Sequence, residues 1–456
     1  LLLNHEEFDF SGGLSVQNFL DQNSSWQLNL EEASVSTDRL TDNIKSLAGI
    51  NKYLKIERIQ FEGRIESKAN QIDFSLNSNN SWGNFITSGF FNSGVFFSEK
   101  AEKTFFIKSD FESMKLIPPM GSKAAVKWGG ALELNGDLSE KEAPELDWKI
   151  AGMYIETPNN KFSDIALEGN YNKRQIRNTL GVENSLVGLK SDLLFDFSNT
   201  IPEYTLAANL TKWDLNHLGL RLGQGKREFQ GVILGTLKGQ NIDDLSGSIK
   251  ISSAKIKNEN EVIDINPITI SQRFVDGETQ LEIINSDCIS GVAKGKFKTS
   301  QLRYLFQHTL HEVYPFLPFV ETQKGQELTF NLKLYKKLLD ALYPDFSISE
   351  NISLKGTIDS DIKNSNITLD APLLRWDTAQ LENLHFQIDT NNPIYNTFLS
   401  VDKLSHPYFK GKAFQMISTE LKDTLYFRSE FTKQGEENTP FEVNFYHTMD
   451  EDIISH

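Results

Sequence analysis

Along most of the chain, apolar residues recur at every second position. In FQGVILGTLK, residues 229–238, Phe229, Ile233 and Leu237 share one side with Gly231 and Gly235. Successive side chains of a β-strand point to opposite faces of its sheet. The alternation therefore predicts an antiparallel sheet of about 25 strands with one apolar and one wetted face. The apolar positions expected to share a face include Ile59, Phe61, Ile72, Phe74, Phe105, Ile107, Leu193, Phe195, Phe229, Ile233, Leu237, Ile249, Ile251, Ile289, Phe297, Ile352, Leu354, Leu384, Phe386, Ile388, Leu425 and Phe427.

A few segments have the period of a helix instead. SQLRYLFQHTLHEVYPFL predicts an amphipathic helix over 300–315, with Ser300 as its N-cap and Pro315 at its end. Shorter helices are expected at 41–54 and 335–343. The apolar stripe of the longest helix consists of Leu302, Leu305, Phe306, Leu310 and Val313.

Clusters of Gly, Pro and polar residues near 117–125, 221–228 and 320–327 are typical of connections. They divide the chain into the segments 1–116, 117–220, 221–320 and 321–456, which we expect to form one continuous sheet. The chain begins with Leu1 rather than methionine, so we expect it to be a piece of a longer protein. No apolar run approaches the roughly 20 residues of a membrane-spanning helix, and any anchor is expected to lie outside these residues.

The charge and the chemistry-bearing residues argue against several function classes. The formal net charge of −16 repels nucleic acid, and no basic stripe offsets it. The single cysteine, Cys288, allows neither an internal disulfide nor a thiolate metal cluster. In HTLHE, His308 and His311 do not have zincin spacing and are expected to be solvated or capping residues. No nucleophile elbow or P-loop is present, so we expect neither enzyme activity, nor a cofactor, nor a metal.

Alternation alone leaves the architecture open. The apolar faces could press together in β-sandwiches, line an open trough, or face lipid in a transmembrane barrel. Helical segments and missing aromatic girdles count against the barrel. The glycines Gly231, Gly235, Gly291 and Gly295 share the apolar register, where they would either leave room for a guest or mark bulges and close packing.

The order of elements resembles the TamB family, in particular its Bacteroidetes members. The segments that carry the resemblance are SLAGINKYLKIERIQFEGRI, YTLAANLTKWDLNHLGL, GTLKGQNIDDLSGSIKISSAKI, GVAKGKFKTSQLRYLFQHTLHEVYPFLP and ISLKGTIDSDIKNSNITLDAPLLRWDTAQLENLHFQIDTNN, within residues 26–430. The resemblance implies a long curved antiparallel sheet bent into an open trough (a β-taco), related to AsmA-like and bridge-like lipid-transfer proteins. It also implies a periplasmic protein, anchored in the inner membrane in its full-length form. Its partners would be phospholipids and an outer-membrane barrel-assembly protein, TamA or a relative.

An apolar trough would account for the missing catalytic residues. Moving a lipid with about 30 methylenes into water costs on the order of 24 kcal/mol, which an apolar groove cancels while the head group stays in water. We therefore expect a non-enzymatic segment that conducts phospholipid acyl chains between the two membranes. The alternatives are a scaffold that offers sheet edges to barrel strands, and a β-rich carbohydrate-binding protein or hydrolase. The 300–315 helix could cap the trough or pack on its outside.

Overall fold

The structure of the protein is a computed structural model. It describes residues 2–4, 8–17, 25–36, 58–68, 70–80, 83–92, 103–116, 126–139, 144–157, 160–218, 225–258, 261–285, 287–343, 346–361, 364–421, 424–433, 440–450 and 453–455. The expected helix at 41–54 lies outside these residues.

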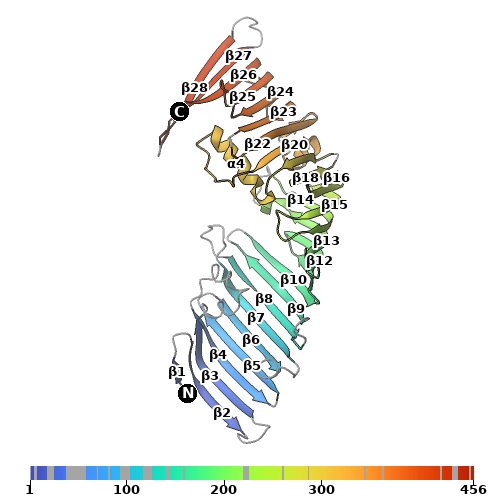
Figure 1. Cartoon of the computed structure of the whole chain (residues 1–456), viewed down its shortest axis with the longest axis vertical. Helices are drawn as coiled ribbons and strands as arrows, with labels where there is room; N and C mark the ends of the chain where they lie inside the picture. Colours follow the sequence, from blue (N-terminus) through green and yellow to red (C-terminus); the bar gives the residue numbers. More distant parts are fainter. Residues whose placement is uncertain are drawn as a thin grey trace. The chain divides into compact units, whose positions relative to one another are not determined.

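The chain forms two compact units, Leu1–Trp213 and Asp214–His456. Both consist mainly of antiparallel β-strands, with short helices in the second unit (Figure 1). The prediction of a mostly β, antiparallel protein that is not closed into a barrel is confirmed. The β-sandwich alternative is not what the structure shows, because the described strands all belong to one open sheet.

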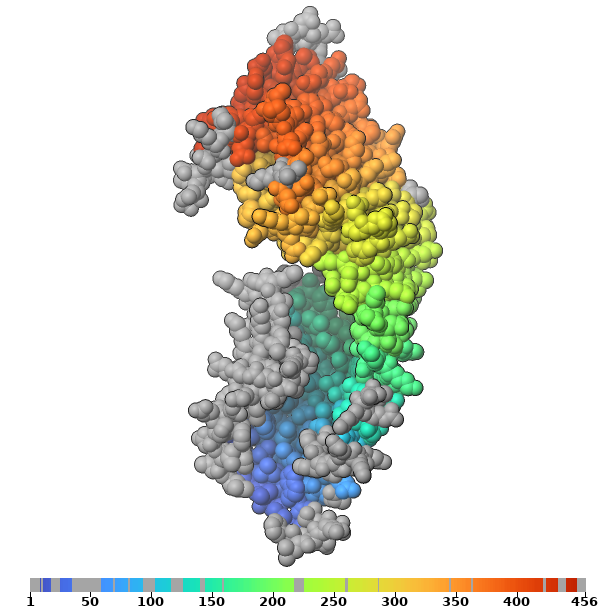
Figure 2. Space-filling model, in the orientation of Figure 1, coloured from blue at the N-terminus to red at the C-terminus, as the bar shows by residue number. Residues whose placement is uncertain are grey.

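The first unit is a meander in which each strand from β1 to β13 pairs with the next one in the chain. Its strands are β1 (Leu2–Asn4), β2 (Phe8–Gln17), β3 (Ser25–Ser36), β4 (Arg58–Lys68), β5 (Gln71–Asn80), β6 (Gly83–Asn92), β7 (Thr104–Leu116), β8 (Val126–Asp137), β9 (Glu145–Glu156), β10 (Lys161–Asn172), β11 (Gln175–Glu183), β12 (Val187–Asp196) and β13 (Glu203–Asp214). Figure 2 shows the teal part of this unit recessed behind the blue and cyan parts beside it.

The second unit continues the same construction with two side branches. β15 pairs with both β16 and β17, and β23 pairs with both β21 and β22. Its strands are β14 (Glu228–Lys238), β15 (Ser246–Lys257), β16 (Val262–Ile265), β17 (Ile268–Val275), β18 (Glu278–Ile284), β19 (Ile289–Gly295), β20 (Glu327–Tyr335), β21 (Phe346–Ile348), β22 (Asn351–Asp359), β23 (Asn364–Trp376), β24 (Ala379–Asp389), β25 (Thr397–His406), β26 (Phe409–Leu421), β27 (Thr424–Lys433), β28 (Pro440–Asp450) and β29 (Ile453–Ser455).

The helices interrupt this meander. Helix α4 (Leu302–Val313) lies between β19 and β20, and α5 (Lys336–Leu342) follows β20 directly. Short 3-10 turns are η1 (Leu215–Leu218) and η2 (Thr299–Gln301). The predicted helices at 300–315 and 335–343 are thus present, with shorter bounds.

The predicted N-cap is wrong. Ser300 lies inside η2, and its N–H and hydroxyl donate to the carboxylate of Asp243 at 2.8 and 3.0 Å. Those bonds tie the start of the helical segment to the β14–β15 turn. The residue before α4 is Gln301, whose side chain makes no capping bond.

β-bulges keep the apolar side chains on one face where simple alternation fails. On β7, Phe111 pairs with Gly130 and Met114 with Trp128, so three steps on one strand match two on the other. The extra residue is taken up by Ser113, whose φ is 54°. Without the bulge, Met114 would face the opposite side from Phe111.

Candidate functional site

The eight predicted apolar positions of the first unit lie on one face of its sheet. Register carries this face from strand to strand: Ile65 pairs with Phe74, Ile72 with Phe91, and Phe91 with Phe105. The face continues through Ile107, Leu134, Trp148, Gly169, Asn178, Leu193 and Leu206, each of which pairs with the next. It therefore crosses the sheet in unbroken rows of paired residues, most of them apolar.

Aromatic rings form two rows of contacts on this face, one on β5 to β7 and the other on β6 to β8. In one row, the ring centroids of Phe91 lie 5.4 Å from Phe74 and 5.9 Å from Phe105. In the other, Phe111 lies 6.1 Å from Phe85 and 5.3 Å from Trp128. Such distances are typical of favourable aromatic pairs. The rows make a surface of rings that runs across the strands.

Among the described residues of the first unit, no helix and no second sheet packs over this face. Most of its large side chains, including Phe74, Ile107 and Trp148, are half-buried and retain accessible surface. In the described part of the chain, the three clusters of fully buried apolar side chains all lie in the second unit. The apolar side chains of the first unit thus lie on one face of a single sheet and stay partly exposed, without a buried cluster of the kind found in the second unit.

Neighbouring side chains occupy the space above the glycines of this face. A Cβ added at Gly136 would lie 2.1 Å from the ring of Phe105, and one at Gly169 would lie 2.6 Å from Trp148. In the second unit, Gly231 lies under Phe229, and Gly291 and Gly295 have φ values of 154° and 141° against neighbouring backbone. These contacts favour close packing over space for a guest at each of these positions.

The opposite face of the first unit carries alternating charges. Lys108, Glu133, Lys149 and Glu168 follow one another across β7 to β10, with Nζ to Oε1 distances of 2.9 Å (Lys108–Glu133) and 2.7 Å (Lys149–Glu168). The hydrogen bond with Lys108 lowers the pKa of Glu133, and the reciprocal bond raises the pKa of Lys108. The bond with Glu168 likewise raises the pKa of Lys149. This charge ladder marks the wetted face of the sheet.

In the second unit, α4 packs on the apolar face of the sheet. Leu305 and Val313 are 1% and 0% exposed and join a core with Phe330 of β20. Burying each of these helix side chains contributes roughly 1.5–3 kcal/mol. Hydroxyl contacts fix the helix further: Thr309 to Ser365 at 3.3 Å and Tyr314 to Thr397 at 3.4 Å. The α4 helix is therefore part of the hydrophobic core of the second unit and covers this part of the apolar face.

Helix α5 covers another part of the same face. Ala341 is fully buried with Ala254, Ile256 and Ile265, and Leu339 packs near Ile352 and Ala371 of β22 and β23. The helix is also held by Lys337, whose Nζ lies 2.5 Å from the Asp287 carboxylate and donates to the Asp264 carbonyl at 2.9 Å.

The predicted positions of the second unit also lie on one face, but in different surroundings. Those buried in or packed against the α4 core are Phe297, Leu354, Phe386 and Ile388; those in the two α5 clusters are Phe229, Ile251, Ile352 and Leu384. Those outside these clusters are Ile233, Leu237, Ile249, Ile289, Leu425 and Phe427, of which Leu425 and Phe427 are buried. Their role as a groove lining stays a prediction.

The histidines of α4 fix the chain that follows the helix. His311 Nδ1 donates to the Leu317 carbonyl at 2.6 Å, and His308 Nδ1 to the Val320 carbonyl at 3.2 Å. Phe319 packs edge-on against both imidazoles, with centroids 5.3 and 5.8 Å away. Among the described residues no group of three or more His, Cys, Asp or Glu could hold a metal ion. Cys288 is buried, and burial raises the pKa of its thiol to about 12.

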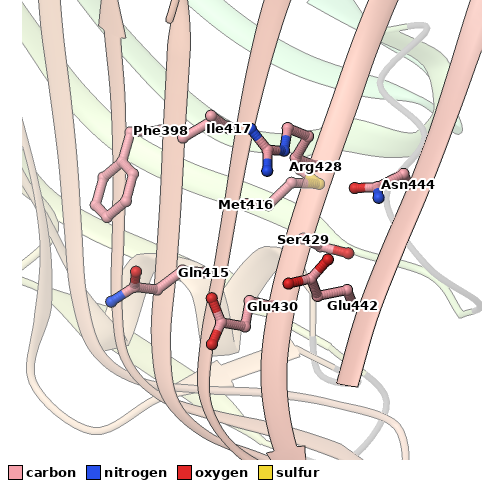
Figure 3. A pocket seen from close by; sticks show the side chains of 9 residues that line it. All are labelled: Phe398, Gln415, Met416, Ile417, Arg428, Ser429, Glu430, Glu442 and Asn444. Carbon is pink, nitrogen blue, oxygen red and sulfur yellow. The ribbon is translucent and has the colours of Figure 1, made fainter. Parts of the chain in front are cut away.

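A polar pocket of about 170 Å³ lies on the wetted face of β25 to β28. Figure 3 shows Gln415, Glu430 and Glu442 side by side, with Arg428 and Asn444 next to them. Glu430 and Glu442 are direct cross-strand partners. The pocket opens on the opposite side of the sheet from the apolar face and contributes nothing to it.

Sequence reasoning missed part of the aromatic surface. Phe85 and Phe91 on β6 are separated by Thr87 and Gly89, which hide the alternation. Trp128 is displaced in register by the bulge at Ser113. Pairing each strand against its neighbour would have found all three.

Comparison with protein-family models, with curated proteins and with solved structures gives no match. The resemblance to TamB therefore stays a hypothesis. No helix in the described part of the chain is long and apolar enough to cross a membrane.

Proposed function

We propose that this chain is a non-enzymatic segment that binds and conducts lipid acyl chains along the apolar face of its sheet. The observation that carries the proposal is the apolar face of the first unit, which continues from β2 to β13 and over which no helix packs among the described residues. The rows of apolar side chains on this face offer acyl chains contact over the width of the sheet, while the opposite, charged face remains in water.

Energetics favour conduction over storage. Moving an acyl chain from a bilayer into water costs a transfer free energy of about 0.8 kcal/mol per methylene. Contact with an apolar protein surface cancels most of that cost. The transfer has little net drive of its own, so direction has to come from elsewhere. The head group can remain in water beside the sheet, so no dedicated charged pocket is needed to bind it.

The resemblance to the TamB family supports a proposal about the cell compartment and the partners of this activity. It suggests a periplasmic bridge, anchored in the inner membrane in the full-length protein, that carries phospholipid between the two membranes. It also suggests an outer-membrane barrel-assembly protein of the TamA type as a partner. Neither nucleic acid nor a cofactor has a role in this proposal.

The proposal is tested with a photo-crosslinking amino acid at Phe91 or Ile107, compared with Lys108 on the charged face. After incubation with phosphatidylethanolamine vesicles, mass spectrometry should detect lipid adducts at Phe91 and Ile107. Lys108, which neighbours Ile107 in the chain, is the matched control. Equal labelling at all three positions, or labelling at Lys108 alone, would contradict the proposal.

A second candidate is a scaffold that adds strands of a partner to its sheet. It is favoured by β28, where Phe441, Val443 and Phe445 are 39–48% exposed on the apolar face. An added strand would gain backbone hydrogen bonds and apolar contacts there. This candidate predicts crosslinks to protein rather than lipid, and no sensitivity to charges placed at Phe91.

A further inference from the structure

One apolar row runs across the whole second unit. Cross-strand register pairs each of its members with the next, from β14 to β28. The row is Gly235, Ile249, Ile270, Ile283, Gly291, Leu332, Leu354, Leu369, Phe386, Leu399, Met416, Ser429 and Val443. It contains no charged side chain.

The middle of this row is less buried than the residues beside it. Along β20, Leu328 and Phe330 are 2% and 3% exposed, but Leu332 is only half-buried. Along β23, Ile367 and Ala371 are 6% and 1% exposed, but Leu369 between them is half-buried. A strip of accessible apolar surface therefore lies between two buried flanks.

The two helices make these flanks. β19 and β20 are antiparallel, so α4, which comes before β20, and α5, which comes after it, lie at opposite ends of that strand. The α4 side chains pack with Phe330 and Ile367, and α5 packs toward Ile352 and Ala371. Their buried contacts form separate clusters, and the row lies along the seam between them, with Leu332, Leu354 and Phe386 packed at the edge of the α4 cluster and Leu369 at the edge of the other.

We infer that α4 and α5 frame a slot, one side-chain row wide, that binds a single linear acyl chain. Neighbouring rows on a face are about 6.7 Å apart along a strand, so one exposed row offers room for one hydrocarbon chain in van der Waals contact. The inference rests on the proposed function and names its substrate in this part of the sheet. A slot of this width selects lipids with one acyl chain over lipids with two. The first unit has no helix over its face among the described residues and makes no such selection.

The length of the slot sets how many chains it takes. From Ile249 on β15 to Leu399 on β25 the row makes eight strand-to-strand steps, or roughly 38 Å at about 4.8 Å each. One leaflet of a bilayer core is about 15 Å thick, so the slot is longer than one acyl chain, but at any point along it there is room for only one chain. A phospholipid would have to splay its two chains, while a fatty acid or lysophospholipid enters directly.

The test uses the full chain and two photoactivatable probes. One is palmitic acid with a diazirine in its chain, and the other is dipalmitoyl phosphatidylcholine with the same group in one chain. After irradiation, labelled residues are mapped by peptide mass spectrometry. We expect palmitic acid to label the row at Leu332, Leu354 and Leu369 about tenfold more than the two-chain lipid does, which corresponds to about 1.4 kcal/mol.

A matched pair of variants sharpens the test. Leu354→Trp fills the slot and should abolish labelling of the row, while Lys355→Trp, on the other face of β22, should leave it unchanged. Labelling of the first unit should survive in both variants, and a urea-unfolding curve for each variant reports whether its second unit is folded. The wild-type comparison of the two probes needs no variant.

The outcomes separate the two proposals. If both probes label the row equally, or if Leu354→Trp has no effect, the slot is refuted. If the first unit is labelled and the row is not, the slot is refuted while the proposed function stands. If neither unit is labelled by either probe, the proposed function fails and the slot fails with it.

Discussion

The two units are built from the same alternating strands but treat their apolar faces differently. In the first unit, the rings of Phe74, Phe91 and Phe105 contact one another across the strands and remain partly exposed. In the second, Phe330 and Ile367 are almost wholly buried beneath α4. Strand pairing keeps one side apolar in both units, so the difference comes from the helices.

The difference teaches that alternation specifies which side is apolar, not what covers it. The first unit's face is rich in aromatic rings that stabilise one another across strands. The second unit buries smaller aliphatic residues against leucines of the two helices. A covered face supplies folding stability, whereas an exposed one is available to a ligand.

The largest expected effect separates the covered from the open face. Leu305→Ala should lower the free energy of unfolding of the second unit by about 3 kcal/mol, because a fully buried leucine leaves a cavity. Leu134→Ala, on the open face of the first unit, should cost about 1 kcal/mol, since its side chain is only half-buried. Urea unfolding measures both, with the fluorescence of the five tryptophans of the first unit and of Trp376, the one tryptophan of the second, as signals.

Comparable losses for the two variants would show that the first unit's face is as well covered as the second's. Leu132→Ala, on the same face of β8 as Leu134, serves as a replicate within the first unit. A loss near 3 kcal/mol there would remove the contrast on which the proposed function rests.

The sequence predicted the strands, the antiparallel sheet and the helices near 302 and 336, because each depends on local periodicity. It failed where two strands had to be compared. Met114 shares a face with Phe111 only through the bulge at Ser113, and Ser300 bonds to the distant Asp243 instead of capping α4. The helix stripe around Leu305 was visible, but not the face on which it packs, since that depends on the sheet beneath.

A smaller effect tests how firmly α5 is attached. Burial alone would raise the pKa of Asp287, but hydrogen bonds from Lys337, the Asn266 N–H and Asn285 outweigh it and lower that pKa. Lys337→Met should cost about 1 kcal/mol at neutral pH, because the lysine is 40% exposed and its ion pair is partly screened.

The pH dependence follows from the sign of that shift. A carboxylate with a depressed pKa contributes stability above its unfolded pKa of about 3.9, and loses it as pH falls through the folded value. The difference between wild type and Lys337→Met should therefore be complete at neutral pH and vanish in stronger acid. Urea titrations at a series of pH values measure it. A difference that persists unchanged into acid would show that the aliphatic stem of Lys337, not its charge, holds α5.

The smallest expected effect lies on the charged face of the first unit. Glu133→Lys places three lysines in a row with Lys108 and Lys149, and like charges directly opposite one another on a sheet are destabilising. Because all three side chains are exposed, the loss should be slight and should shrink with added salt. In the wild type, the depressed pKa of Glu133 keeps it ionised at neutral pH, and the raised pKa values of both lysines keep them charged there, so the loss should be present at neutral pH. Thermal unfolding in low and high salt measures it, with Glu133→Gln as the neutral control. Lipid labelling at Ile107 should not change in either variant, because the ladder and the rings lie on opposite faces; reduced labelling would mean that the charged face takes part in lipid binding.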